Sequence, residues 1–317
     1  MRTPIRPTLL VLSLFGLALP LARSQAPARS TQHTFTEIAP GVYSATAPPS
    51  LNGGSNSAVL VNRDDVVVVD SHMTPEAGRV LLQEIKTITD KPVRFLIDTH
   101  FHYDHTDGNQ VFAPIADVIG HEYTRARLTA PNYTTTGMLG NLLTSGNALA
   151  ASLRDLKPTA PNVTLTDHLT LWRGDREIRI LHLGRGHTGG DVVVYLPKER
   201  VLCTGDLLVN GIANLIDGFV NVWPDALEKL KPLDFSDVIP GHGDPFKGKE
   251  RIDWFQAYLR DLWKQATALH DRGVPAAEAA RQVDLTSHKA HYPAITASGV
   301  NPAYMARIYE AIENRAQ

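Results

Sequence analysis

The sequence is poor in cysteine. Cys203 is the only one in 317 residues, so the chain can form no internal disulfide. Because this residue lies in the apolar, strand-like stretch RVLCTGD, we expect a buried small side chain there rather than a ligand or a nucleophile. The stability of the fold must therefore come from its core or from bound metal.

An excess of positive charge is also missing. Lysine and arginine number 31 against 33 for aspartate and glutamate, and the formal net charge is −2. The chain thus offers no basic footprint for a nucleic-acid backbone, which disfavours a nuclease and leaves a small molecule as the expected substrate.

Long hydrophobic runs are scarce, and the one that stands out is at the N-terminus. Arg2 and Arg6 precede the apolar run Thr8–Ala22, and the small residues of RSQA follow it. This three-part pattern is typical of a secretory signal peptide, and the run is short for a membrane span. We therefore expect residues 1–26 to be removed and the protein to be exported, to a bacterial periplasm or outside the cell, without a membrane span. An uncleaved N-terminal anchor is the alternative.

Beyond a polar linker at residues 27–34, segments typical of strands alternate with segments typical of helices. Runs rich in β-branched residues predict strands at 41–47, 57–63, 65–70, 92–100, 116–120, 168–174, 177–184, 191–197, 200–206 and 236–240. Apolar residues at helical spacing predict helices at 74–89, from about 121, at about 224–232 and from about 247 onward. Thr74 is placed as the N-cap of the first helix, with Pro75 at its first position. This alternation indicates an α/β layered fold.

The stretch HFHYDH places four ligand-type side chains in the loop at the end of the strand predicted at 92–100. They are His100, His102, Asp104 and His105. Three further ligand-type residues follow other predicted strands, namely His187, Asp206 and His242. Because loops at strand ends along one edge of an α/β sheet can converge, and ligands bind at that edge, we expect these seven residues to lie together.

Imidazoles and carboxylates in this pattern are typical of zinc-type sites. His100 and His102 alternate along an extended segment, so both can face one ion. The expected ligands of a first metal are His100, His102 and His187. Those of a second metal are Asp104, His105 and His242, with Asp206 near enough to bridge the two. Seven other histidines are expected at the surface or as satisfied residues: His33, His72, His168, His182, His270, His288 and His291. His121 also stands at a strand end, but no motif pairs it with the site, so a ligand role is the less favoured of its two interpretations.

The segments THFHYDHTDGN, GHTGGDVVVYLP, TGD and PGHGD together resemble the metallo-β-lactamase superfamily, in the right order over residues 35–250. The resemblance implies a four-layer αβ/βα sandwich of two mixed β-sheets flanked by helices, with a dinuclear site at one edge. It implies the same two ligand sets and a supporting role for Asp70, which ends the VVVVD strand. Residues 251–317 go beyond the family pattern and are expected to form a helical extension packed on this domain.

One departure from the zinc β-lactamases is Asp206, which stands where those enzymes carry a cysteine ligand. In having aspartate at this position, the chain resembles the broader hydrolase superfamily. Replacing a cysteine thiolate by a carboxylate changes the charge distribution and the metal preference of the second site. We predict a dinuclear metallo-hydrolase with two zinc ions, iron or manganese being alternatives. A metal-bound hydroxide would attack a carbonyl of a β-lactam, lactone or ester, and Asp104 would orient that hydroxide and relay its proton.

Three alternatives to this function stay open. The first is a lactonase or thioester hydrolase without β-lactamase activity. The second is a mono-iron sulfur dioxygenase, and the third is a non-catalytic periplasmic metal-binding protein. The pocket walls are expected from the irregular segments 48–56 and 130–165, the latter either a mobile flap or a short helical excursion over the site. The oligomeric state is left open.

Overall fold

The computed structural model describes residues 31–314. The signal peptide predicted for residues 1–26 and the first residues of the predicted linker lie outside the described residues and stay predictions. The domain boundary predicted near residue 250 also stays a prediction. Within the described part of the chain, no helix is both long and apolar enough to cross a bilayer.

Seven strands form the first sheet. In sheet order they are β1 Thr34–Ala39, β2 Val42–Thr46, β3 Asn56–Val61, β4 Val66–Val69, β5 Val93–Ile97, β6 Asp117–His121 and β7 Val163–Leu165. Neighbours from β1 to β4 run antiparallel, and those from β4 to β7 run parallel. The carboxyl ends of β4 and β5 therefore meet at one edge of this sheet.

Six strands form the second sheet. In sheet order they are β13 Phe246–Lys247, β12 Asp237–Pro240, β11 Val201–Gly205, β10 Val193–Leu196, β9 Arg176–Leu181 and β8 His168–Arg173. Only β11 and β12 pair in parallel in this sheet, so their carboxyl ends also share an edge.

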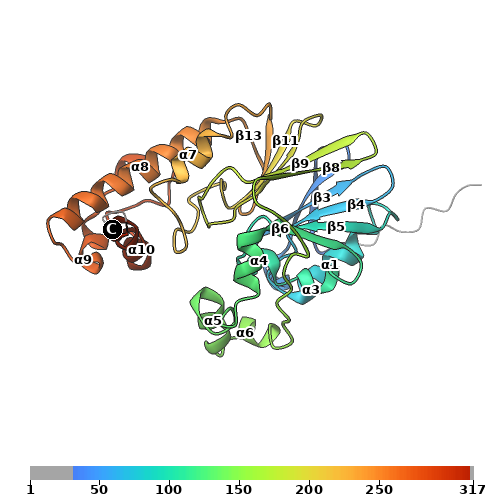
Figure 1. Ribbon diagram of the computed structural model, residues 1–317, viewed down its shortest axis with the longest axis horizontal. Helices are drawn as coiled ribbons and strands as arrows, with labels where there is room; N and C mark the ends of the chain where they lie inside the picture. Colours follow the sequence, from blue (N-terminus) through green and yellow to red (C-terminus); the bar gives the residue numbers. More distant parts are fainter. Residues whose placement is uncertain (1–30, 315–317) are drawn as a thin grey trace, which may run out of the picture. The chain divides into compact units, whose positions relative to one another are not determined.

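Helices cover the outer faces of the two sheets (Figure 1). Between strands of the first sheet, the chain forms α1 Pro75–Ile85, α2 Tyr103–Thr106, α3 Asn109–Phe112, α4 Glu122–Leu128, α5 Gly137–Thr144 and α6 Ala148–Ser152. Of these, α1 and α3 contribute to the apolar core on the outer face of the first sheet. The later helices are α7 Trp223–Glu228, α8 Glu250–Asp271, α9 Ala276–Gln282 and α10 Pro302–Glu313, with short 3₁₀ turns at Pro49–Leu51 and Thr286–His288. The helices α7 to α10 share one apolar core with the outer face of the second sheet.

The period of two in strand β4 shows how the sequence builds these layers. Val67 and Val69 point into the core between the two sheets, whereas Val66 and Val68 point toward the helical side. All four are buried, and each such side chain contributes about 1.5–3 kcal/mol through its removal from water. A continuous run of valines is thus the expected sequence of a strand covered on both faces.

The predicted four-layer sandwich with C-terminal helices is confirmed. The helix predicted at 74–89 begins as expected, because the Thr74 hydroxyl accepts a hydrogen bond from the Ala77 N–H, but it ends at Ile85. Strands β1, β7 and β13 are additions to the prediction. Between 130 and 165 the chain forms α5 and α6, which is the helical form of the two alternatives.

Candidate metal centre

All seven predicted ligand residues lie at strand ends on the edge where the parallel strands of both sheets finish. The loop after β5 carries four of them, which are His100, His102, Asp104 and His105. His187 follows β9, Asp206 directly follows β11, and His242 follows β12. The structure brings these residues into two touching clusters.

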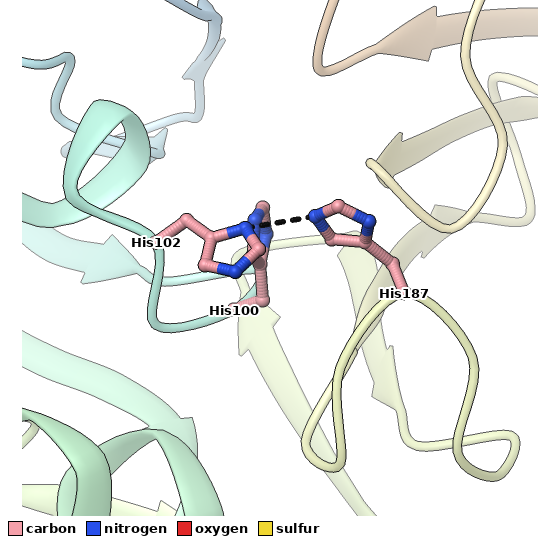
Figure 2. Close-up of side chains that lie close together, drawn as sticks. All are labelled: His100, His102 and His187. Atoms are coloured by element: carbon pink, nitrogen blue, oxygen red, sulfur yellow. Dashed lines mark hydrogen bonds between the residues drawn. The ribbon is translucent and has the colours of Figure 1, made fainter. Parts of the chain in front are cut away.

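The first cluster consists of His100, His102 and His187, whose rings lie nearly perpendicular to one another (Figure 2). Its ring centroids are 4.6–4.7 Å apart, and His102 Nδ1 lies 2.8 Å from His187 Nε2. All three residues are at most 4% exposed. One nitrogen from each ring therefore faces a common point that is shielded from solvent.

The second cluster consists of Asp104, His105 and His242. His242 Nε2 lies 3.1 Å from Asp104 Oδ2, and His105 Nε2 lies 3.8 Å from the same oxygen. The His242 side chain is 39% exposed, so this cluster is more open to solvent than the first.

Asp206 lies between the two clusters. Its Oδ2 is 3.5 Å from His187 Nε2 and 3.3 Å from His242 Nε2, and its Oδ1 is 3.5 Å from His105 Nε2. This carboxylate contacts both sets, which is the bridging position that the sequence predicts for it.

Four of the histidines use one ring nitrogen to bind an oxygen on the far side from the cluster. His102 Nε2 bonds to Asp217 Oδ2 at 3.0 Å, and His187 Nδ1 bonds to the Asn214 carbonyl at 2.9 Å. Such outward bonds place the N–H on the outer nitrogen and leave the inner nitrogen with a free lone pair, as metal-binding histidines require.

Asp70, which directly follows β4, supports the other two histidines. Its Oδ2 lies 2.7 Å from His105 Nδ1, and its two oxygens accept bonds from the Thr99 N–H and hydroxyl. The Thr99 hydroxyl in turn lies 3.1 Å from His100 Nδ1. One buried carboxylate thus orients a ligand of each cluster.

The inner atoms of these residues fit a metal. Among the described side chains, His100 Nε2, His105 Nε2 and Asp206 Oδ1 are buried and have no hydrogen-bond partner. Buried polar atoms are rarely left unpaired, because the desolvation cost is large. A cation at the centre of each cluster would satisfy all three atoms, and imidazole with carboxylate is a donor set for zinc-type ions.

Two histidines of the first cluster, His100 and His187, are held neutral. Burial, followed by the neighbouring His105 and His187, lowers the pKa of His100 well below its ordinary value. Burial also lowers the pKa of His187 to about 3, although the Asp206 carboxylate opposes this. Neutral imidazoles are the form that binds metal.

The second cluster is a set of charge pairs. Burial disfavours charge on His105, but Asp70, Asp206 and Asp104 outweigh it and raise the pKa of this residue to about 9. Burial likewise opposes charge on His242, whose pKa the carboxylates of Asp206 and Asp104 raise to about 11. The same contacts overcome burial and lower the pKa of Asp206 below its ordinary value and that of Asp104 to about 2.

A pocket of about 110 Å³ opens beside the first cluster, and His102 forms part of its wall. Its lining is completed by Phe101 and Tyr103, by residues 127–139 and by Ile216 and Asp217. The predicted wall from segment 130–165 is thus present, whereas segment 48–56 does not line this pocket. Sequence reasoning missed Asp217 and Asn214, because they lie in an irregular loop without a motif.

Residues 51–242 match the family described as the metallo-beta-lactamase superfamily, and this match covers more than half of the chain. The chain belongs to the metallo-beta-lactamase superfamily. The resemblance inferred from the four motifs is therefore confirmed.

Individual relatives are more distant. The chain is 26% identical over 263 residues to a linear primary-alkylsulfatase of Pseudomonas sp., which covers 72% of this chain and 50% of that protein. It therefore spans about half the length of the alkylsulfatase. It is 25% identical over 230 residues to the metallo-beta-lactamase type 2 of Bacteroides fragilis, covering 69% of this chain and 82% of that one.

A solved structure of a metallo-beta-lactamase from Pontibacter korlensis has the same fold. It aligns with a TM-score of 0.57 and 23% identity, covering 72% of this chain and 99% of that chain. The named relatives are hydrolases, and this chain is a hydrolase of the same superfamily, as predicted.

Proposed function

We propose that the protein is an exported, dinuclear metal-dependent hydrolase. Water attacks the carbonyl carbon of a small β-lactam, lactone or ester, and the acyl C–N or C–O bond breaks. The observation that carries this proposal is the pair of clusters joined by Asp206, with unpaired buried atoms pointing inward from both. His100, His102 and His187 would hold one ion. Asp104, His105 and His242 would hold the other.

Bound divalent metal, zinc first and iron or manganese as alternatives, would supply a water that is nucleophilic at neutral pH and an electrophile for the carbonyl oxygen. The chain contributes the remaining steps. Asp104, which is partly exposed, lies where its carboxylate can orient the attacking water and receive its proton. The buried lining of the first cluster excludes bulk water from the reacting bond.

The pocket beside His102 is the proposed place for the substrate. Met138, Leu139 and Ile216 give it apolar walls. Arg127 lies over the Phe101 ring at 4.5 Å, so its positive charge stands at the pocket wall. A substrate with an apolar portion fits this lining, and an anionic group on it would pair with Arg127.

A second candidate is the hydrolysis of a sulfate ester. The similarity to the linear primary-alkylsulfatase favours it, and an alkyl sulfate also combines an apolar chain with an anionic group. In this case the nucleophile would attack at sulfur or carbon rather than at a carbonyl, within the same pocket.

Metal analysis of the purified protein, together with turnover of matched β-lactam, lactone, thioester and alkyl sulfate substrates, tests the proposal. We expect two metal ions per chain and turnover of one carbonyl substrate class. Two ions with turnover of alkyl sulfate alone would replace the first candidate by the second. One iron per chain with oxygen consumption, or metal binding without any turnover, would overturn the hydrolase mechanism.

The variant His102→Ala is the matched test of the site. It removes a ligand of the first cluster and the wall of the pocket, so we expect loss of turnover with the fold retained. The control is His168→Ala, whose ring is exposed on β8 and pairs with Asp167. Turnover by His102→Ala at the level of the wild type and of His168→Ala would refute the site assignment.

Export is tested separately. Expression of the full chain, followed by cell fractionation and N-terminal sequencing, should yield a periplasmic or secreted protein that begins at residue 27. A cytoplasmic protein that keeps residues 1–26 would contradict the export proposal and leave the hydrolase proposal intact.

A further inference from the structure

A strained turn lies directly behind the second cluster. Asp70 and His72 both have left-handed backbone conformations, with φ angles of 61° and 72°. Both residues are buried, and neither is a glycine. Non-glycine residues keep such conformations only where the surrounding structure holds them firmly, often beside functional groups.

Hydrogen bonds connect this turn to the second cluster. His105 Nδ1 lies 2.7 Å from Asp70 Oδ2, and the Ser71 N–H donates to the His105 carbonyl at 2.8 Å. The Ser57 hydroxyl donates to the Asp70 carbonyl at 2.7 Å and lies 3.2 Å from His72 Nε2. The position of the His105 ring therefore depends on how firmly this turn is held.

The N-terminal segment reaches the far side of the same turn. His33 Nε2 lies 3.1 Å from His72 Nε2, and the two rings stack with centroids 5.0 Å apart. His33 is 2% exposed, although the sequence places it in a polar linker. It is therefore packed into the domain, just before β1 begins.

Glu84 on α1 fixes this segment in place. Its carboxylate accepts hydrogen bonds from the backbone N–H groups of Gln32 and His33, and its Oε2 lies 2.7 Å from His33 Nδ1. On the other side, His72 Nδ1 donates to the Ser55 carbonyl at 3.0 Å. The pair of histidines is thus held at both outer nitrogens.

We propose that His33 and His72 are positioning residues for the second metal, through which the N-terminal segment sets the affinity of Asp104, His105 and His242 for their ion. The connection runs from Glu84 through both histidines and Ser57 to Asp70 and then to His105. This inference rests on the proposed dinuclear site.

The effect should be selective for the second cluster. Asp70 bonds directly to His105, but it reaches only one member of the first cluster, His100, and does so through Thr99. His102 and His187 are oriented by Asp217 and Asn214 instead. Loosening the turn therefore weakens the second site more than the first.

The test is a titration of the metal-free protein with Zn²⁺ against a chromogenic chelator, which measures the two binding constants without any substrate. For His33→Ala we expect the second equivalent to bind about tenfold more weakly. This is the low end of the roughly 10- to 100-fold loss for direct partners of metal-bound histidines, because His33 acts through His72, Ser57 and Asp70. The first equivalent should change less than threefold. His33→Gln, which keeps a side-chain amide near His72 and Glu84, should recover part of the loss.

His168→Ala is the control, because it removes an exposed histidine on β8 of the second sheet and should leave both constants unchanged. Unchanged binding of both equivalents in His33→Ala and His33→Gln would overturn the inference. Equal weakening of both equivalents would overturn it too, because His33 would then support the fold rather than the second site. A wild-type protein that takes up only one equivalent would instead refute the proposed dinuclear function.

Discussion

The two ligand clusters share one aspartate but are built on opposite electrostatic principles. The first consists of three buried imidazoles, and the surroundings of His100 and His187 keep these two neutral and ready to bind a cation. The second pairs two histidines with carboxylates, and these raise the pKa of His105 to about 9 and that of His242 to about 11. Without metal, the protons on its histidines take the place of the cation.

This difference has a consequence for how the sites fill. A cation that binds His100 and His187 displaces no proton from them, whereas a cation entering the second cluster must replace protons held on His105 and His242. The first site should therefore fill first at neutral pH. The second is also more exposed, through His242, which makes it the easier one to empty.

The largest expected effect comes from the residue that the clusters share. Asp206→Asn keeps the size of the side chain but removes the negative charge that faces His105, His187 and His242. Removing one partner of a buried ion pair costs about 3–5 kcal/mol. We expect zinc affinity of the second site to fall by roughly 100- to 1,000-fold, and turnover to fall with it, as measured by chelator competition and steady-state assay. Asp175→Asn, on the exposed pair with Lys198, should change neither.

Gly241 gives a steric version of the same test. A Cβ at this position would lie 2.2 Å from Asp206 Oδ1 and 2.8 Å from His105 Cε1. Gly241→Ala should therefore push Asp206 out of place and weaken the second site by about tenfold or more, with a smaller effect on the first. In Gly146→Ala the added methyl meets nothing within 4 Å, so only stability should fall, by about 1 kcal/mol for its left-handed backbone. Equal metal binding in the two variants would contradict the tight packing at Gly241.

Much of this arrangement could be predicted from the sequence because it rests on local signals. The alternation of β-branched strands and amphipathic helices predicts the layers of the fold. The HFHYDH motif, together with the ligand-type residues that follow three later strands, predicts the seven site residues. Their orienting partners could not be predicted in the same way. Asp217, Asn214 and His33 lie in irregular segments, and they reach the site only through long-range packing that no spacing rule encodes.

The first cluster has its own selective variant. Asp217→Ala removes the carboxylate that bonds His102 Nε2 and leaves the bonds of His105 and His242 untouched. We expect the first zinc to bind about tenfold more weakly while the second changes little, which is the reverse of the pattern proposed for His33→Ala. The two binding constants from the same zinc titration check this. If Asp217→Ala weakens the second equivalent more, the two clusters are not oriented independently.

The last prediction concerns the stability of the metal-free protein as a function of pH. The folded pKa values of His105 and His242, about 9 and about 11, lie above the unfolded value of about 6.5, so the folded state binds protons more tightly. Their contribution to the free energy of unfolding is complete below pH 6.5 and is lost as the pH rises toward 9 and beyond.

Asp104, with a folded pKa of about 2, contributes above pH 4 and loses this contribution as the pH falls toward 2. His105, His242 and Asp104 together favour the highest Tm of the metal-free protein between about pH 4 and 6.5. The lowered pKa of His187 moves this maximum toward pH 6.5, because its neutral folded form loses stability as the pH falls below that value. Bound zinc replaces those protons, so the loss above pH 6.5 should disappear in the loaded protein. A metal-free protein whose Tm rises from pH 6.5 to 9 would show that the second cluster is not held together by these charge pairs.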